Sequence, residues 1–538
     1  NGPDIVTGHI QYADDVQLPG MLYGRILRSP HAHARIKKID ASKARKLAGV
    51  IDVVTAQDIP NLSLFATTEV CFEGEKIAAV AAIDPDIAED ALELIRVDYE
   101  ILPAVTDPVE GMAHDAPETK LGAPSEAIKD PNGRPYRNLT GHNLREEGDV
   151  EKGFAEADAI VEFEYSTPFW HQTYMEPNAA TAQVEPNGRI TVWTSGQGSF
   201  SLRDAVAGAL KMPKGQVRVI MAEMGGGFGG KNNVYGEPVA MALSRKSNRP
   251  VKMVMSRGEV FRATGPTSGG HMTVKLGATK DGRITAAKAD LAFQAGAFPG
   301  APIGPATMTA FACYDLENVL ATGYDVISNR PKVAAYRAPG AQVIAFAVES
   351  AMDELAKKLE IEPIELRMKN AAKEGTRAAY GPVFGPIGMV ETLQAIKDHP
   401  NYNVPLGPNQ GRGVASGFWF NIGGETSVTM NLNEDGTVAL LVGNPDIGGS
   451  RASMSMMAAE ELGIEAEDVR VSIADTGSLG FNFLSAGSRT TFAVGKTTIE
   501  AAREVITEMK ARAAKIWDIP EDAVVWEDGH ARPASTNA

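Results

Sequence analysis

The part of this chain best suited to chemistry is a glycine cluster that runs from residue 224 to residue 232 as MGGGFGGKN. Glycines leave successive backbone N–H groups uncovered, and such a nest of amides binds anionic oxygens of a phosphate or of a metal-oxo group. The missing side chains also let a flat, bulky group pack against the main chain. The cluster therefore predicts a loop that binds an anion or a cofactor.

Two nucleotide-binding patterns overlap this cluster. Gly225–Gly230 has the glycine spacing of a dinucleotide fingerprint, but the acidic residue expected about twenty positions later is missing. Ser256-Arg257 follows the next expected strand instead, and a basic residue there would suit a 2′-phosphate. With Lys231 the stretch also fits a phosphate loop, except that Asn232 stands where a Ser or Thr would hold magnesium. An NADP-dependent oxidoreductase is thus one alternative.

Three other segments could present donors to the same ligand. The turn Gly196-Gln197-Gly198 precedes the cluster, and a Gly/Ser loop lies at 485–488. The segment AYRAPG places Arg337 just ahead of a helix expected at 341–359, whose free N-terminal N–H groups favour anions. The alternative for Arg337 is a solvated side chain at an ordinary helix start.

The elements that must position these loops recur twice in the same order. Each set consists of a hairpin, a glycine turn, a helix, a strand and a glycine-containing loop. The hairpin turns are Asn187-Gly188 and Asp435-Gly436, and such Asx-Gly pairs are strong hairpin signals. We expect the helices at 202–210 and 453–462 and the strands at 217–221 and 469–473. This repeat predicts two duplicated domains that face each other.

Length and composition indicate a multidomain α+β protein. The chain has 538 residues, of which 43% are hydrophobic and 22% charged, enough for several packed domains. Its formal net charge of −16 argues against a nucleic-acid surface or an anionic membrane surface. We expect an N-terminal α/β domain at 1–110, a linker at 111–150, and two α+β domains at 151–405 and 406–538, the second incomplete at its C-terminus.

Cysteine content limits what the chain can hold by itself. Its two cysteines, Cys71 and Cys313, are too few for a thiolate-bound iron–sulfur cluster or structural zinc site. Both are expected in the core, where free cysteine usually lies. The absence of a disulfide framework makes the cytoplasm the expected compartment.

An ordered set of motifs resembles one family. GGGFGGK after a strand, WTSGQG before it, AYRAPG ahead of a long helix and GSRTTFAVG near the end occur in a single order. Together they resemble the molybdopterin-binding large subunit of the xanthine oxidase family of molybdenum hydroxylases, over essentially the whole chain. The resemblance implies that the duplicated α+β domains bind molybdopterin.

The resemblance also implies a role for particular residues. The side chain of Gln197 would hydrogen-bond the oxo ligand of molybdenum, and Arg337 would lie against the metal site. No side chain would ligate the metal directly. The backbone of one loop, Gly227, Phe228 and Gly229, would approach molybdenum and the pterin. A second loop would hydrogen-bond the pterin through Ala486, Gly487, Ser488 and Thr490.

Departures from the family pattern bear on the substrate. Purine-oxidising members carry a glutamate after the lysine of GGGFGGK, where this chain has Asn232, and an arginine where it has Pro305. Carbon monoxide dehydrogenases carry a cysteine where Ala338 follows Arg337. With Asn232 and Ala338 in the substrate pocket, neither purine nor carbon monoxide is expected. Aldehydes, aromatic compounds and N-heterocycles remain, as does reductive dehydroxylation.

The resemblance further implies hydroxylation with water as the oxygen source and a cofactor of the cytosine dinucleotide form. Partner subunits would carry [2Fe-2S] centres and FAD, which agrees with the low cysteine count. The family's general base is a glutamate in a Gly-Val-Gly-Glu-type loop, which this sequence lacks. We expect that loop in a truncated segment or on a separate chain. A non-catalytic scaffold that needs another chain for catalysis is therefore a further alternative.

Three aromatic or basic sites have two interpretations each. His171 could shape the site, although a hydrogen-bonded structural histidine is favoured. The run Phe418–Phe420 could line a substrate funnel, although a core role is favoured. Gly448-Gly449-Ser450 stands where the family has a second Gly-Gln-Gly motif, and the neighbouring Arg451 could replace the lost donor.

Overall fold

The computed structural model describes residues 2–122, 128–130, 132–473 and 475–535. The N-terminal part is the expected α/β unit. Its elements are β1 (Leu22–Arg28), β2 (Ala34–Asp40), β3 (Val50–Thr55), β4 (Glu69–Val70), β5 (Lys76–Ala82), α2 (Pro85–Glu93) and β6 (Arg96–Ile101). The predicted start of α2 is confirmed, because the Asp84 carboxylate accepts from the N–H of Asp86 and Pro85 takes the first helical position.

A seven-stranded sheet joins this unit to the next one. Its order is β11-β10-β9-β12-β1-β5-β3, with β9 (Ala179–Val184), β10 (Ile190–Thr194), β11 (Val217–Met221) and β12 (Val251–Val254). The junction is the parallel pair of β1 and β12, in which Tyr23 lies opposite Lys252. Helices α5 (Ser199–Ala209) and α6 (Glu237–Ser247) pack against β11 and β9. The N-terminal unit and the first repeat thus share one sheet.

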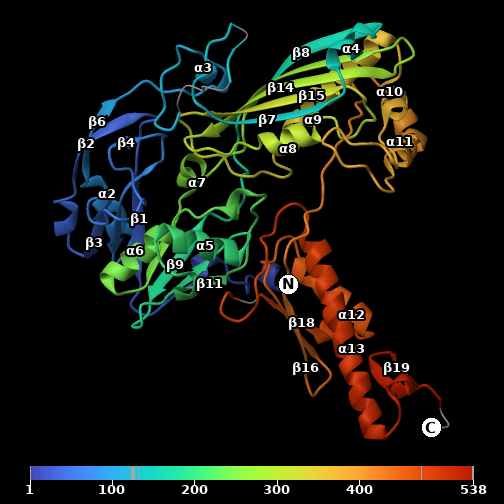
Figure 1. The fold of residues 1–538 in the computed structure, drawn as a ribbon. Helices are drawn as coiled ribbons and strands as arrows, with labels where there is room; N and C mark the ends of the chain where they lie inside the picture. The colour runs from blue at the N-terminus through green and yellow to red at the C-terminus, as the bar shows by residue number, and fades with distance from the viewer. Residues whose placement is uncertain (1, 123–127, 131, 474, 536–538) are drawn as a thin grey trace.

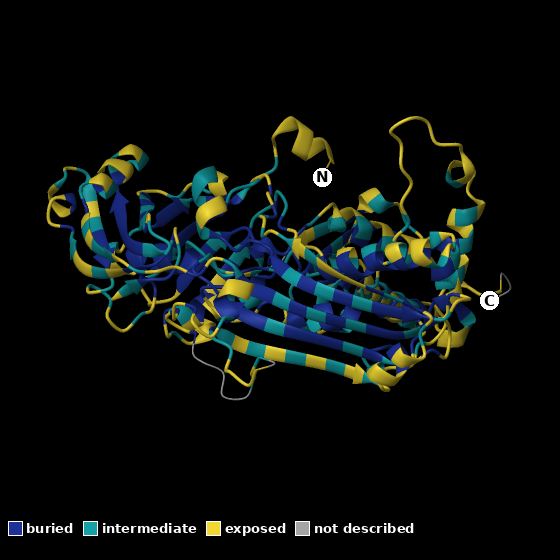
Figure 2. Ribbon diagram, turned by 90° about the horizontal axis from the view of Figure 1, so that it is seen from above, coloured by how far each residue is buried: buried dark blue, intermediate teal, exposed yellow. Residues whose placement is uncertain are grey.

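A five-stranded sheet forms the other large layer (Figure 1). Its order is β7 (Leu139–Glu147), β15 (Val319–Ile327), β14 (Ile284–Gly296), β13 (Gly270–Ala278) and β8 (Ala159–Thr167). Helix α9 (Ala341–Leu359), found where it was predicted, packs against β13 and β8. Figure 2 shows the resulting stripes of buried and less buried residues along the strands. Strand β7 corrects our expectation of an irregular linker, since residues 139–147 pair with β15.

The last part of the chain stands apart from the larger body in Figure 1. It contains β16 (Val428–Leu432), β17 (Val438–Val442), α12 (Ser450–Leu462), β18 (Val469–Ile473), α13 (Gly495–Trp517), β19 (Val524–Glu527) and β20 (His530–Pro533). Its antiparallel hairpin, helix and parallel return strand match β9, β10, α5 and β11. The predicted repeat of elements is confirmed.

Seven further α-helices lie outside these sets in the described part of the chain. They are α1 (Gly2–Thr7), α3 (Pro108–Met112), α4 (Val150–Ala155), α7 (Arg257–Ala263), α8 (Ile303–Thr309), α10 (Pro363–Asn370) and α11 (Met389–Asp398). Helix α8 packs between β15 and α9 and helps to hold the start of α9, which follows the AYRAPG segment.

Candidate cofactor site

The glycine cluster forms a loop with several residues in the left-handed region. Gly226 has φ 90°, Phe228 has φ 53° and Gly229 has φ 105°. The loop follows β11 and ends in a 3-10 turn at Gly230–Asn232, whereas α6 begins only at Glu237. A dinucleotide fingerprint or a phosphate loop requires a helix that opens directly on the last glycine. Both nucleotide patterns therefore lack their structural context here.

Glycine is required where this loop meets two other predicted segments. A Cβ on Gly229 would lie 2.4 Å from the carbonyl oxygen of Ala335, and one on Gly227 would lie 2.7 Å from Gln197 Oε1. The N–H of Gly229 donates to Gln197 Oε1 at 2.8 Å, and the N–H of Arg337 donates to the carbonyl oxygen of Phe228 at 2.8 Å. The structure thus brings the glycine loop, the Gln197 turn and the AYRAPG segment together.

The loop of the second repeat reaches the same place. Gln197 Nε2 donates to the carbonyl oxygen of Ser485 at 2.9 Å, and the N–H of Ser485 donates back to the carbonyl oxygen of Gln197 at 2.7 Å. Thr490 Oγ1 donates to Ser485 Oγ at 2.9 Å. Gly487 and Ser488 both have φ 58°, and Thr490 begins a π-helical turn. Both polar atoms of the Gln197 side chain are therefore bonded to protein groups, and its contact with an oxo ligand stays a prediction.

Ion pairs bridge the two repeats beside these loops. Arg218 lies 2.6 Å from Asp475, but the arginine side chain is 45% exposed. The better buried guanidinium of Arg451 pairs with Glu223 and, at 3.0 Å, with Asp446. Burial alone would raise the pKa of Asp446, but hydrogen bonds and charge from Arg451 lower that pKa on balance. Arg451, which we considered as a replacement donor to a cofactor, is thus engaged by two carboxylates.

A pocket of about 410 Å³ opens where α9 begins. Its lining includes Ala338, Gln342, Cys313, Phe418 and Trp419, so one of the two residues predicted for the substrate pocket lies in it. Asn232 does not line this pocket. The ring of Phe420 stacks on that of Trp419 with centroids 4.5 Å apart. Phe418 packs against the hydrophobic core, as the favoured interpretation expects, and Phe418 and Trp419 also line this pocket, which supports the funnel interpretation.

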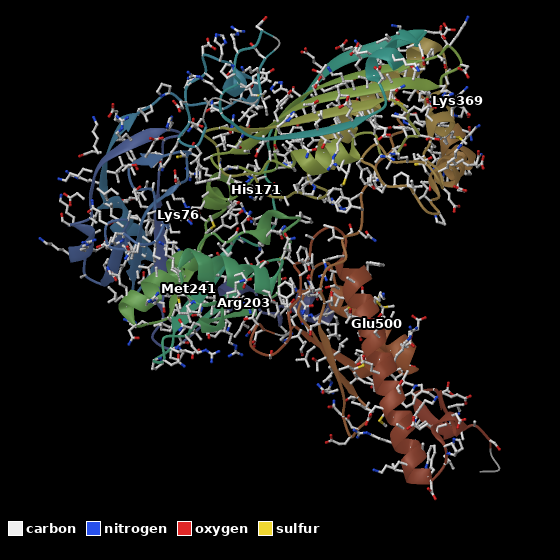
Figure 3. The ribbon with its side chains drawn as sticks, in the orientation of Figure 1. Lys76, His171, Arg203, Met241, Lys369 and Glu500 are labelled. Atoms are coloured by element: carbon white, nitrogen blue, oxygen red, sulfur yellow. The ribbon has the colours of Figure 1, made fainter. Side chains whose placement is uncertain are left out.

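His171 is half-buried beside α7 in the larger body (Figure 3) and has the favoured structural role. Its Nδ1 accepts from the N–H of Thr173 at 3.0 Å, which leaves the proton on Nε2, 2.6 Å from Thr264 Oγ1. The ring meets that of Phe261 edge-on at 5.3 Å. Burial, together with the charge of Arg257, lowers the pKa of His171 to about 4, so the ring is neutral near pH 7.

Known proteins share this arrangement. Residues 7–103 match the aldehyde oxidase and xanthine dehydrogenase a/b hammerhead domain, and residues 135–371 and 391–538 match two molybdopterin cofactor-binding domains. A probable xanthine dehydrogenase subunit of Bacillus subtilis is 31% identical over 96% of this chain and 70% of its own length. The chain is a molybdopterin-binding large subunit of the xanthine dehydrogenase family. This is a family of oxidoreductases.

Other members of the family resemble the chain in sequence and in fold. The nicotinate dehydrogenase large molybdopterin subunit of Eubacterium barkeri is 34% identical over 73% of this chain and 92% of its own length. The crystal structure of quinoline 2-oxidoreductase from Pseudomonas putida 86 superimposes with a TM-score of 0.88 at 25% identity, covering 99% of this chain and 73% of the other. Within the described residues, none of the helices combines the length and apolar character needed to cross a membrane.

The residues at these loops fit a molybdopterin. Buried polar atoms without a hydrogen-bond partner are rare in native proteins and often mark a ligand or water site. Among the described residues, several such atoms lie on segments that border the loops, and they include Gln172 Oε1, Glu176 Oε1, Asn232 Oδ1, Gln342 Oε1 and Asn444 Oδ1. A Cβ on Gly230 would lie 3.0 Å from Gln172 Oε1, and Asn444 Nδ2 donates to Ser485 Oγ at 3.2 Å. These spare acceptors suit the donor groups of a polar pterin, and they lie beside a loop whose Gly225 and Gly229 N–H groups are already bonded to Glu176 and Gln197.

Sequence reasoning missed two groups beneath the glycine loop. Lys231 was considered only as a phosphate-loop lysine, and no role was predicted for Glu176. In the structure their side chains form a buried ion pair with 2.5 Å between Nζ and Oε2. The lysine follows directly on the glycine cluster, but nothing local in the sequence connects it with a carboxylate 55 positions earlier.

Proposed function

We propose that this chain is the cofactor-holding catalytic subunit of a molybdenum hydroxylase or dehydrogenase. Its substrate would be an aldehyde, an aromatic compound or an N-heterocycle, with water as the oxygen source. The observation that carries this proposal is the convergence of Gly225–Gly230, Gln197 and the Ser485 loop, which come from two repeats far apart in the chain. We keep 1–110, 151–405 and 406–538 as proposed domains and 111–150 as the segment between the first two, except that strand β7 (Leu139–Glu147) belongs to the sheet of the second.

The proposed cofactor contacts are main-chain donors and short polar side chains. The cofactor supplies the two-electron redox chemistry when it is bound. The chain's part is to orient it through Gly227, Phe228, Gly229, Arg337, Ala486, Gly487, Ser488, Thr490 and the amide of Gln197. Because these donors sit on glycine turns of two domains, they can address both the pterin and the phosphates of a cytosine dinucleotide form.

The aromatic pocket is the proposed entrance for substrate. The small residue Ala338 lines this pocket and directly follows Arg337, whose N–H bonds the glycine loop. The pocket therefore reaches the segment that contacts that loop. Phe418 and Trp419 offer flat apolar faces to an aromatic ring, a contact that contributes about 0.5–1.5 kcal/mol beyond area burial. Ala338 stays a proposed substrate-pocket residue in this pocket, whereas Asn232, which does not line it, stays a proposed substrate contact at the end of the glycine loop. Phe418→Ala should raise KM for an aromatic aldehyde more than for a short aliphatic one.

Electrons from the substrate must leave through other chains. The two cysteines, Cys71 and Cys313, are both buried, and they are too few to hold a cluster. We therefore propose partner subunits with [2Fe-2S] centres and FAD, in the cytoplasm. The glutamate base would come from a segment outside this sequence or from a separate chain.

Purification of the intact complex tests this proposal. The chain would be produced in a host that makes the dinucleotide cofactor, together with its native neighbours, and analysed for molybdenum, iron, pterin nucleotide and chain composition. We expect one molybdenum and one pterin for each copy of this chain, with iron in proportion to a partner. Bound nicotinamide nucleotide without molybdenum would overturn the proposal, and molybdenum without turnover in a complete complex would favour the scaffold alternative.

A further inference from the structure

A lysine ammonium group is completely buried beneath the glycine loop. The side chain of Lys231 is 0% exposed, and its Nζ lies 2.5 Å from Oε2 of Glu176, which is 10% exposed. The ammonium also donates to Ser195 Oγ at 3.3 Å and lies 5.0 Å from the ring centre of Tyr174. Burial lowers the pKa of Lys231, and the charge of Glu176 opposes that shift. Burying two charges carries a desolvation penalty, so the pair is weak evidence for stability alone.

This ion pair connects the parts of the cofactor site. Glu176 Oε2 also accepts from the N–H of Gly225 at 2.9 Å, and the N–H of Glu176 donates to the carbonyl oxygen of Gly225 at 3.2 Å. At the other end of the loop, the carbonyl oxygen of Lys231 accepts from the N–H of Gln197 at 3.0 Å. The pair therefore fixes the first residue of the glycine loop, the residue after its last glycine, and the Gln197 turn.

The loop between these fixed ends is held in a conformation that it would not adopt freely. Phe228 has φ 53°, a left-handed value that disfavours a residue with a side chain. Such a residue persists only where surrounding contacts over-determine it. A loop already held in its binding shape does not lose conformational freedom when its ligand arrives, which strengthens binding.

We propose that Lys231 and Glu176 are positioning residues that hold the glycine loop in its cofactor-binding shape before the cofactor arrives. They act through Gly225 and Gln197 and need not touch the cofactor themselves. The inference rests on the proposed function, because it takes the glycine loop as part of the cofactor site. It adds a cause for the loop's shape that the motif itself does not contain.

Two single variants and a matched control test this inference. Lys231→Met and Glu176→Gln each break the pair. The control, Arg367→Met, breaks an ion pair of similar burial between α10 and α9. In that pair Arg367 is 0% and Glu349 8% exposed, with 2.7 Å between Nε and Oε2. In the two loop variants we expect molybdenum and pterin content to fall by at least about tenfold, as is typical when outer partners of a metal site are removed. Amide hydrogen exchange at 225–230 in the cofactor-free chain should also become faster. The control should lower the melting temperature but keep both properties.

A double variant, Lys231→Met with Glu176→Met, removes both charges and so avoids an unpaired buried charge if the single variants do not fold. We expect it to melt closer to the wild type and still to lose the cofactor. Wild-type cofactor content and wild-type loop exchange in the folded variants would overturn the inference and leave the pair a purely structural contact. A wild-type chain without any pterin would instead overturn the proposed function, and the exchange measurement on the cofactor-free chain separates the two failures.

Discussion

Replacing Gly229 by alanine changes the candidate site by a single methyl group. The residue has φ 105°, in the left-handed region, where a side chain costs about 1–2 kcal/mol. The added Cβ would lie 2.4 Å from the carbonyl oxygen of Ala335, whereas an ordinary contact begins at 3.4 Å, so one of the two segments must move by about 1 Å. Overpacking of this kind costs about 1–3 kcal/mol. The sum is a destabilisation of about 2–5 kcal/mol.

The displacement also reaches the donors of the proposed cofactor site. The N–H of Gly229 is bonded to Gln197, and the carbonyl oxygen of Phe228 is bonded to the N–H of Arg337. A misplacement of about 1 Å at reacting groups lowers rates by about 100-fold. We therefore expect Gly229→Ala to melt at least about 4 °C lower, to contain less molybdenum and to lose most of its activity.

Gly208→Ala is the matched control for this experiment. Gly208 lies in α5 and is exposed, and a Cβ added there would have no heavy atom from a neighbouring segment within 4 Å. Alanine in a helix stabilises by about 0.5–1 kcal/mol relative to glycine. The same chemical change should thus have opposite signs at the two positions, measured by thermal melting and by molybdenum content. A Gly229→Ala protein with the melting temperature and metal content of the wild type would refute the reasoning.

Three further predictions follow from buried polar groups. Burial lowers the pKa of His171 from 6.5 to about 4. Its neutral form therefore adds stability that is complete above pH 6.5 and is lost as the pH falls toward 4. The drop in melting temperature from pH 7 to pH 5 should be smaller in His171→Gln than in the wild type. Burial raises the pKa of the Cys71 and Cys313 thiols to about 12. Iodoacetamide at pH 8 should therefore label neither thiol in the native chain and both in denaturant. Labelling of the native chain would contradict this prediction. Arg451→Met leaves two carboxylates unpaired and should lower the free energy of unfolding in urea by about 1–3 kcal/mol. Arg218→Met, at an exposed ion pair, should lower it by less than about 1 kcal/mol. Equal losses of stability would argue against a role of burial.

Much of the local structure could be predicted because its causes are local. The hairpin at Asn187-Gly188, the strands at 217–221 and 469–473, and the helix Ala341–Leu359 all lie where turn chemistry and hydrophobic spacing placed them. The ordered motifs GGGFGGK, WTSGQG, AYRAPG and GSRTTFAVG resemble one family, and the comparisons confirm that family. Strand β7 was missed, because its sequence is polar and half exposed and therefore reads as a loop.

The amino-acid sequence by itself determined which segments form turns, strands and helices and where the glycine loops lie, because these properties depend on neighbouring residues. Only the tertiary structure decided which partners meet. It paired β1 with β12, set Gln197 against Ser485 at a separation of 288 residues, and buried Lys231 against Glu176. Such contacts depend on how whole domains pack, and no short-range pattern in the sequence encodes that packing.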